Sequence, residues 1–208
     1  MSSACGSVTD AYFEELFSHS SDPWSMRQRW YEQRKRDLTL AALPLPRYGR
    51  GFEAGCANGE LSLRLAERCD DLLCCDTSAT AVELASQRLQ QVPHARVQQA
   101  RLPEQWPSGE FDLIVISELG YYLDPQDLHR LIGKARAALS RDGILLACHW
   151  RHPIAECPQS GDQVHACLHE RLHLEPVLRH EEADFLLEVW GTLATSVAAR
   201  EGLLGSAS

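Results

Sequence analysis

The chain has 208 residues, of which 44% are hydrophobic and 24% are charged, and its formal net charge is -9. This length and composition indicate one globular domain, with a core large enough to fold without disulfides or a structural metal. The acidic balance argues against a protein that binds nucleic acid or an anionic membrane surface through basic charge.

We expect residues 1–10 and 191–208 to be flexible tails. Between these two segments, helical patterns alternate with strand patterns. The expected helices cover residues 11–17, 27–43, 61–69, 79–90, 125–139 and 164–174. The expected strands cover residues 51–54, 71–75, 96–100, 111–117, 144–148, 175–179 and 185–190. Turns are expected at residues 21–24 and 142–143. Continuous apolar strands between amphipathic helices predict a parallel sheet covered on both faces, with ligands at the carboxyl ends of its strands.

The eight cysteines include the neighbours Cys74 and Cys75 in a strongly apolar stretch, and no C-x-x-C pair occurs. We see no cationic N-terminal segment followed by an apolar run, so we expect no signal peptide. No apolar run approaches the roughly 18 residues that a membrane span needs. We therefore expect reduced thiols, several of them in the core, in a cytoplasmic protein.

A turn of small residues follows the first expected strand, where residues 52–59 read FEAGCANG. Gly55 and Gly59 let the backbone approach a ligand closely, and Asp76 at the end of the next strand can accept both hydroxyls of a ribose. A dinucleotide-binding turn would read G-x-G-x-x-G. Glu53 would repel a pyrophosphate but suits an ammonium group, so the pattern favours S-adenosylmethionine; the alternative is a tight turn with no ligand.

These motifs resemble class I S-adenosylmethionine-dependent methyltransferases, and more narrowly the NodS-like group of nodulation N-methyltransferases. The resemblance runs over most of residues 12–190, in the stretches DPWSMRQRWYEQRKRDLTLAALP, FEAGCANGELSLRLAERC, LPEQWPSGEFDLIVISELGYYL and GILLACHWRHP. It implies a three-layer, Rossmann-like, doubly wound α/β sheet of seven mostly parallel strands with an antiparallel last strand. It also implies a helical lid at residues 11–46 and a cofactor-binding core at residues 47–190.

The cofactor implied by the resemblance is S-adenosylmethionine, with S-adenosylhomocysteine as its product. The resemblance implies that Glu53, Gly55 and Gly59 cradle the methionine part, that Asp76 holds the ribose and that Leu102 lies by the adenine. The other expected cofactor contacts are Cys56, Thr77, Ser78, Pro103, Ser117, Glu118 and, from the lid, Trp24 and Tyr31. Many family members carry an acidic residue in the adenine loop. This chain reads ARLP there, so we expect backbone contacts to the adenine.

Methyl transfer from a sulfonium needs mainly alignment of the nucleophile and exclusion of water. An amine nucleophile must first lose a proton, and His149, at the end of the fifth expected strand, is the candidate base. A structural histidine is the alternative at that position. The candidate substrate contacts are Tyr121, Tyr122 and Arg151. The tyrosines could instead pack against the next helix, and Arg151 could pair with a surface carboxylate.

Histidines and cysteines crowd into residues 149–180, and His165, His169 and His173 share one helix face. Histidines four residues apart on a helix can bind zinc. No H-E-x-x-H and no C-x-x-C frame accompanies them, so we expect a solvent-facing strip and no functional metal.

We therefore expect a methyltransferase acting on a small molecule, with N-methylation of an amino sugar or related amine as the first interpretation. O-methylation of a small metabolite, or a non-catalytic protein that binds S-adenosylmethionine, remains open. We expect no nucleic-acid partner, because no basic stripe occurs and SELG follows the fourth strand where base methyltransferases carry [DN]-P-P-[YFW]. We also expect no membrane partner, and a monomer or a homodimer.

Overall fold

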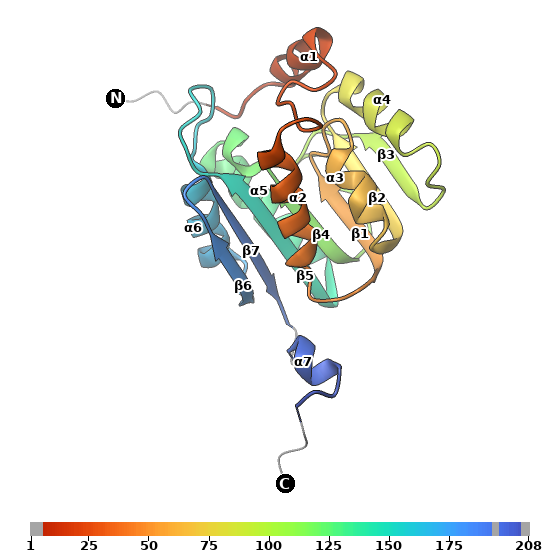
Figure 1. Cartoon of the computed structure of the whole chain (residues 1–208). Helices are drawn as coiled ribbons and strands as arrows, with labels where there is room; N and C mark the ends of the chain where they lie inside the picture. Colours follow the sequence, from red (N-terminus) through yellow and green to blue (C-terminus); the bar gives the residue numbers. More distant parts are fainter. Residues whose placement is uncertain (1–5, 193–195, 205–208) are drawn as a thin grey trace.

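A seven-stranded sheet with helices on both faces forms the body of the protein in the computed structural model, which describes residues 6–192 and 196–204 (Figure 1). Its strand order is β3-β2-β1-β4-β5-β7-β6. Strands β1 to β5 pair in parallel, and β7 lies antiparallel between β5 and β6. The expected three-layer, doubly wound sheet of seven strands with an antiparallel last strand is confirmed.

The elements keep the order expected from the sequence. The strands are β1 (Tyr48–Ala54), β2 (Cys69–Asp76), β3 (Ala95–Gln99), β4 (Phe111–Ser117), β5 (Leu139–Trp150), β6 (Glu175–Glu181) and β7 (Phe185–Gly191). The helices are α1 (Asp10–His19), α2 (Trp30–Ala41), α3 (Glu60–Ala66), α4 (Ala79–Arg88), the 3-10 turn η1 (Gly120–Tyr122), α5 (Pro125–Ala138), α6 (Gly161–Arg171) and α7 (Val197–Arg200).

Several expected bounds differ from the observed ones, and two of the differences have local causes. The helix expected at residues 27–43 begins later, at Trp30, because the Asp22 carboxylate accepts the backbone N–H groups of Met26 and Arg27 and holds a turn there. The turn expected at residues 142–143 lies inside β5, at an irregularity in its register with β4.

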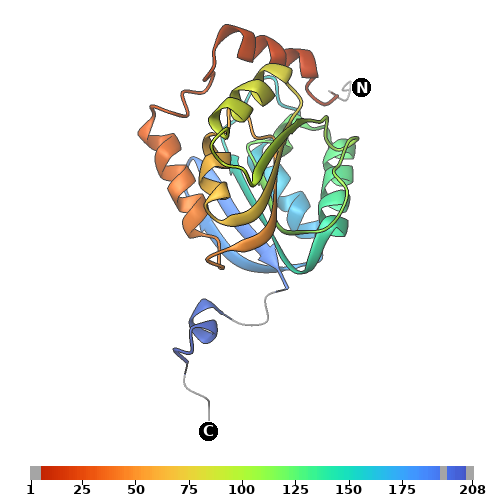
Figure 2. The same cartoon turned by 90° about the vertical axis from the view of Figure 1, so that its right-hand side faces the viewer.

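The expected flexible ends are only partly described. Within the C-terminal segment, α7 forms a short helix that lies beyond the end of the sheet opposite α1 (Figures 1 and 2). Residues 1–5, 193–195 and 205–208 lie outside the described residues.

The core has two halves, one on each face of the sheet. Successive side chains of a strand point to opposite faces, so Leu113 and Val115 of β4 pack with α2, α3 and α4, whereas Ile114 and Ile116 pack with α5 and α6. The continuous apolar run of β4 therefore reflects burial on both faces. All seven cysteines in the described residues are free thiols, and five of these are buried, as expected. None of the helices in that part of the chain has the length and apolarity of a membrane span.

The carboxyl ends of β1, β2, β4 and β5 meet at one edge of the sheet. Helix α1 lies across this edge, and α2 descends from it along one face of the sheet (Figures 1 and 2). The side chains at these strand ends, together with α1 and α2, therefore surround one space.

Replacing the fully buried Ile114 of β4 with alanine should lower the free energy of unfolding by about 3 kcal/mol, because burial is lost and a cavity remains. Urea denaturation followed by circular dichroism measures the loss. The control is Val177→Ala on β6, where the valine is 39% exposed and the loss should stay below about 0.5 kcal/mol. Equal losses in the two variants would contradict this account of the core.

Candidate active site

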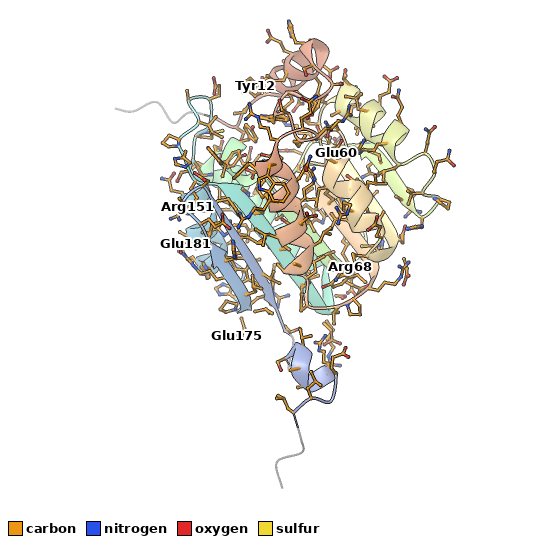
Figure 3. The ribbon with its side chains drawn as sticks, in the orientation of Figure 1. Tyr12, Glu60, Arg68, Arg151, Glu175 and Glu181 are labelled. Carbon is orange, nitrogen blue, oxygen red and sulfur yellow. The ribbon has the colours of Figure 1, made fainter. Side chains whose placement is uncertain are left out.

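A cavity of about 710 Å³ lies at the carboxyl edge of the sheet, beneath α1 and beside α2. Its size is that of a small-molecule or cofactor site. Its walls come from α1, the 20–29 segment, α2 and the segments that follow β1, β2, β3, β4 and β5. Tyr12, labelled on α1 in Figure 3, belongs to the upper wall.

The glycine turn after β1 is fixed by hydrogen bonds to β2. The backbone N–H groups of Gly55 and Cys56 both donate to the Cys75 carbonyl at 2.9 Å. Gly55 has φ +76°, which suits glycine, and its missing side chain leaves room beside Leu119. Gly59, with φ +79°, does not line the cavity. A Cβ there would meet the Ala85 backbone at 3.1 Å, so this glycine allows α3 to pack closely on α4.

Glu53 is a buried carboxylate in the wall of the cavity. Its Oε2 accepts a short hydrogen bond from the Ser62 hydroxyl of α3. Burial raises the pKa of Glu53 to about 7, against the hydrogen bond from Ser62 that lowers it. No ion pair neutralises this carboxylate within the described residues, so a cationic group in the cavity would find a partner here.

Asp76 ends β2 and joins the glycine turn to the start of α4. Its Oδ2 accepts the Ala57 N–H at 2.9 Å, and its Oδ1 accepts the Ser78 N–H at 3.0 Å. Burial raises the pKa of Asp76 above its ordinary value, while the backbone N–H donors lower it. The carboxylate lines the cavity in one fixed orientation, which suits recognition of a vicinal diol.

Carboxylates on α1 tie this helix to the start of α4. The Thr77 hydroxyl donates to Asp10 Oδ1 at 2.7 Å, and the Ser78 hydroxyl donates to Glu14 Oε2 at 2.6 Å. Ser78 also caps α4 by accepting the Ala81 N–H, and it does not line the cavity. Pro103, which is buried, does not line it either. The expected cofactor contacts of Gly59, Ser78 and Pro103 therefore do not coincide with the cavity wall.

Glu118, directly after β4, accepts hydrogen bonds from three parts of the structure. Its Oε1 accepts Lys35 Nζ of α2 at 2.7 Å, and its Oε2 accepts the Tyr121 hydroxyl at 2.6 Å and the Trp150 N–H at 3.0 Å. Glu118 also has φ +54°, a left-handed backbone that costs a non-glycine residue free energy and is typical of functional sites.

Lys35 and Glu32 belong to the cavity wall but were not predicted from the sequence. Lys35 Nζ lies 3.1 Å from Glu32 and 2.7 Å from Glu118. Burial alone would lower its pKa, yet the two carboxylates hold the pKa of Lys35 above its ordinary value. The available signal was the spacing of Tyr31 and Lys35, four residues apart on one helix face.

Most of the predicted site residues line the cavity. These residues are Glu53, Gly55, Cys56, Asp76, Thr77, Leu102, Ser117, Glu118, Trp24, Tyr31, Tyr121 and Tyr122. Tyr122 packs edge-on against Phe13 of α1 at 4.8 Å between ring centroids, so it contributes to the cavity wall and also supports α1. The structure therefore brings together the parts expected to hold cofactor and acceptor.

His149 lies outside this wall, contrary to the role of a base that contacts substrate. It is fully buried, its Nε2 accepts the Gly120 N–H at 3.1 Å, and its Nδ1 faces His165 Nε2 at 3.1 Å. Because Gly120 donates to Nε2, the proton of the neutral ring sits on Nδ1. Burial lowers the pKa of His149 well below its ordinary value, as does the neighbouring His165. Both nitrogens are engaged, which supports the structural alternative.

The expected solvent-facing histidine strip is wrong for His165, which is buried. His165 Nδ1 contacts the Glu188 carboxylate at 2.6 Å, and His169 Nε2 contacts its other oxygen at 2.8 Å. The histidines of α6 thus belong to a hydrogen-bonded chain that runs from β7 to Gly120. No cluster of three or more potential ligands that could hold a metal ion is found in the described part of the chain.

Arg151 does not line the cavity either. It binds Asp162 at 2.8 Å and Glu181 at 2.9 Å, and Figure 3 shows it beside Glu181. The prediction that Arg151 contacts the substrate is therefore not supported. It pairs with carboxylates near the surface, the alternative expected from the sequence.

Comparisons with known proteins agree with the fold. A family model described as a methyltransferase domain matches residues 52–143. A crystal structure of a protein from Pseudomonas syringae, described as a methyltransferase, is 66% identical, with a TM-score of 0.71 over 78% of this chain and 99% of that chain. The crystal structure of N-methyltransferase NodS from Bradyrhizobium japonicum WM9 in complex with S-adenosylhomocysteine is 26% identical, with a TM-score of 0.78 over 87% of this chain and 96% of that chain.

Nodulation protein S from Rhizobium tropici is 28% identical over 130 residues, which is 61% of this chain and 54% of the relative. The chain spans about half the length of the curated relatives that it matches first. The doubly wound sheet, the glycine turn and the carboxylates at the strand ends are the features of a class I S-adenosylmethionine-dependent methyltransferase. The chain belongs to this family, within its NodS-like group.

Replacing His149 with glutamine should weaken the dependence of stability on pH. Below about pH 6.5 the unfolded chain protonates His149 and the folded chain does not, so stability falls as the pH falls. In His149→Gln, the slope of unfolding free energy between pH 5 and 6.5 should shrink by about 1 kcal/mol per pH unit. Urea denaturation at several pH values measures it, with His129→Gln on α5 as the control. An unchanged slope in His149→Gln would contradict the neutral, buried imidazole.

Proposed function

We propose that the chain transfers a methyl group from S-adenosylmethionine to the nitrogen of a small amine, and that an amino sugar is its best acceptor. The observation that carries this proposal is the group of carboxylates around Lys35 in the cavity wall. The similarity of this chain to the crystal structure of N-methyltransferase NodS supports nitrogen as the acceptor atom.

The residues at the glycine turn fit the cofactor on three counts. Gly55 has no side chain and tolerates the positive φ of this turn, so the backbone can approach a ligand, and the buried Glu53 carboxylate suits the ammonium of the methionine part. Asp76 presents both oxygens in a fixed orientation that suits the ribose hydroxyls. Leu102 lies in the wall after β3, where we place the adenine. When bound, S-adenosylmethionine supplies a methyl group already activated by its sulfonium.

The acceptor side of the cavity favours a cation. Glu32 and Glu118 flank the single ammonium of Lys35, so these three groups carry a net charge of -1 when all are ionised. An amine in its ammonium form would neutralise that charge, and the strength of such pairing increases in a partly desolvated site. A neutral hydroxyl would leave the excess carboxylate unmatched.

Glu118 is the group that would hold the proton released by this ammonium. Three donors from the described residues reach its two oxygens, which together offer about four acceptor positions. One position therefore remains for a donor on the acceptor molecule. That position is on Oε1, which accepts only Lys35 among these donors, so Oε1 can bind the ammonium, take its proton and leave a free amine in place. The hydrogen bonds from Tyr121 and Trp150 to Oε2 hold the carboxylate in orientation.

The segment at residues 11–46 acts in this proposal as a lid, through Trp24 in the 20–29 segment and Tyr31 on α2. Hydrogen bonds from the start of α4 to Asp10 and Glu14 would hold it closed over the cofactor and exclude water. Tyr121 and Tyr122 would line the acceptor side. The proposal also includes a small-molecule acceptor and action in the cytoplasm, where the free thiols would stay reduced.

Incubation with tritiated S-adenosylmethionine should label glucosamine and leave N-acetylglucosamine unlabelled, because acetylation removes the nucleophilic nitrogen. Glu118→Gln should lower kcat by about a hundredfold, the usual scale for loss of a proton acceptor. Glu110→Gln, at an exposed position remote from the cavity wall, is the matched control and should keep its activity. Label on N-acetylglucosamine, or no label on any amine, would overturn nitrogen as the acceptor atom.

Binding of S-adenosylhomocysteine should weaken as the pH falls below about 7, because Glu53 is then protonated in the free protein and must lose its proton to pair with the ligand ammonium. Isothermal titration calorimetry should give a Kd that rises about tenfold per pH unit below pH 7 and is flat above it. Glu53→Gln should bind more weakly at pH 8 and lose this slope. A slope that persists in the variant would exclude Glu53 as its source.

A further inference from the structure

The hydroxyl of Tyr31 is an unpartnered polar group in the cavity wall. Its oxygen is buried, and no hydrogen-bond partner for it is found among the described residues. A buried hydroxyl without a partner destabilises the protein, and native proteins seldom leave one unsatisfied. Because Tyr31 lines the cavity, a ligand that contacts this residue can supply the missing partner.

The Tyr31 ring is held in place by its neighbours. Trp150 at the end of β5 packs edge-on against it at 5.5 Å between centroids, and Phe185 of β7 does so at 6.2 Å. Lys35 Nζ lies 5.0 Å from the ring centroid, as a cation over an aromatic face. These contacts on separate elements fix where the hydroxyl points, so it cannot swing freely towards solvent.

The surroundings of Tyr31 place it on the acceptor side of the cavity. Its neighbours are Lys35 and Trp150, which both contact Glu118, whereas Glu53 and Asp76 mark the cofactor side at the ends of β1 and β2. Burial raises the pKa of Tyr31 above its ordinary value, so the phenol keeps its proton and can donate it in a hydrogen bond. The lid position of Tyr31 had suggested a contact to the cofactor instead.

We propose that the Tyr31 hydroxyl donates a hydrogen bond to an oxygen of the acceptor that lies beside the methylated nitrogen. Tyr31 thereby selects amines with a neighbouring hydroxyl over plain alkyl amines, since an amine without that oxygen leaves the phenol unpaired. This inference rests on the proposed function. It gives Tyr31 the role of a specificity-determining residue in acceptor binding.

Tyr31→Phe removes one oxygen and keeps the ring contacts, so the variant tests the hydroxyl alone. The KM for glucosamine should rise about tenfold, while the Kd for S-adenosylhomocysteine stays within about twofold of the wild type. With cyclohexylamine, which has no hydroxyl, wild type and variant should have equal KM values. Tyr48→Phe on β1 is the matched control, because it makes the same change at a tyrosine outside the cavity wall and should leave both KM values unchanged.

Three outcomes would overturn the inference or separate it from the proposed function. A loss of S-adenosylhomocysteine affinity in Tyr31→Phe would assign the hydroxyl to the cofactor and overturn the inference. Equal KM values for glucosamine in wild type and variant would overturn it while leaving N-methylation intact. If the wild type methylates only oxygen acceptors, N-methylation fails, and a KM for those acceptors that rises in Tyr31→Phe still supports the hydroxyl contact.

Discussion

The hydrogen bonds of the Glu118 carboxylate connect the elements that surround the cavity. Through Lys35, Tyr121 and the Trp150 N–H, this one side chain joins α2, the turn after β4 and the end of β5. The joint is possible because parallel strands end at the same edge of a sheet, so segments far apart in sequence come within reach of one carboxylate. The left-handed backbone of Glu118 is the local cost of aiming that carboxylate inward.

Three carboxylates at strand ends line the cavity, and each has different surroundings. Glu53 is buried and lacks a cation among the described residues, Asp76 is fixed by backbone N–H groups, and Glu118 shares Lys35 with Glu32. Each arrangement suits a different ligand group: an ammonium, a diol and an acceptor amine. Buried carboxylates that await a cation or a diol destabilise the free protein, so binding of cofactor and acceptor should also stabilise it.

The sequence predicted best where one physical rule decides the outcome. The run FDLIVIS matches β4 at both ends because burial on two faces demands continuous apolar residues. Glu53 and Asp76 were found because strand ends place them at the ligand edge. Lys35 was missed because a basic residue in a charged helix is normally expected at the surface. Its burial and its pairing with Glu118, 83 residues away, depend on the tertiary structure.

The prediction for His149 was wrong in the opposite direction, since this residue was predicted in the site and lies outside the cavity wall. Its place at the end of a strand suggested catalysis, yet the 3-10 turn after β4 covers it and the Gly120 N–H occupies its Nε2. The environment of a side chain at a strand end depends on how the following turn packs. No local sequence pattern predicts that packing. Sequence patterns therefore predicted residues of the cavity wall at the ends of β1 and β2, but they missed Lys35 and misplaced His149, because that part of the structure is built from long-range contacts.

The central claim is that the acceptor amine binds the Glu118 carboxylate beside the cofactor. A crystal structure with S-adenosylhomocysteine and glucosamine tests it most directly. We expect the ammonium of S-adenosylhomocysteine on Glu53, its ribose on Asp76 and the glucosamine nitrogen within hydrogen-bond distance of Glu118. Glucosamine bound with its nitrogen away from Glu118 would contradict it.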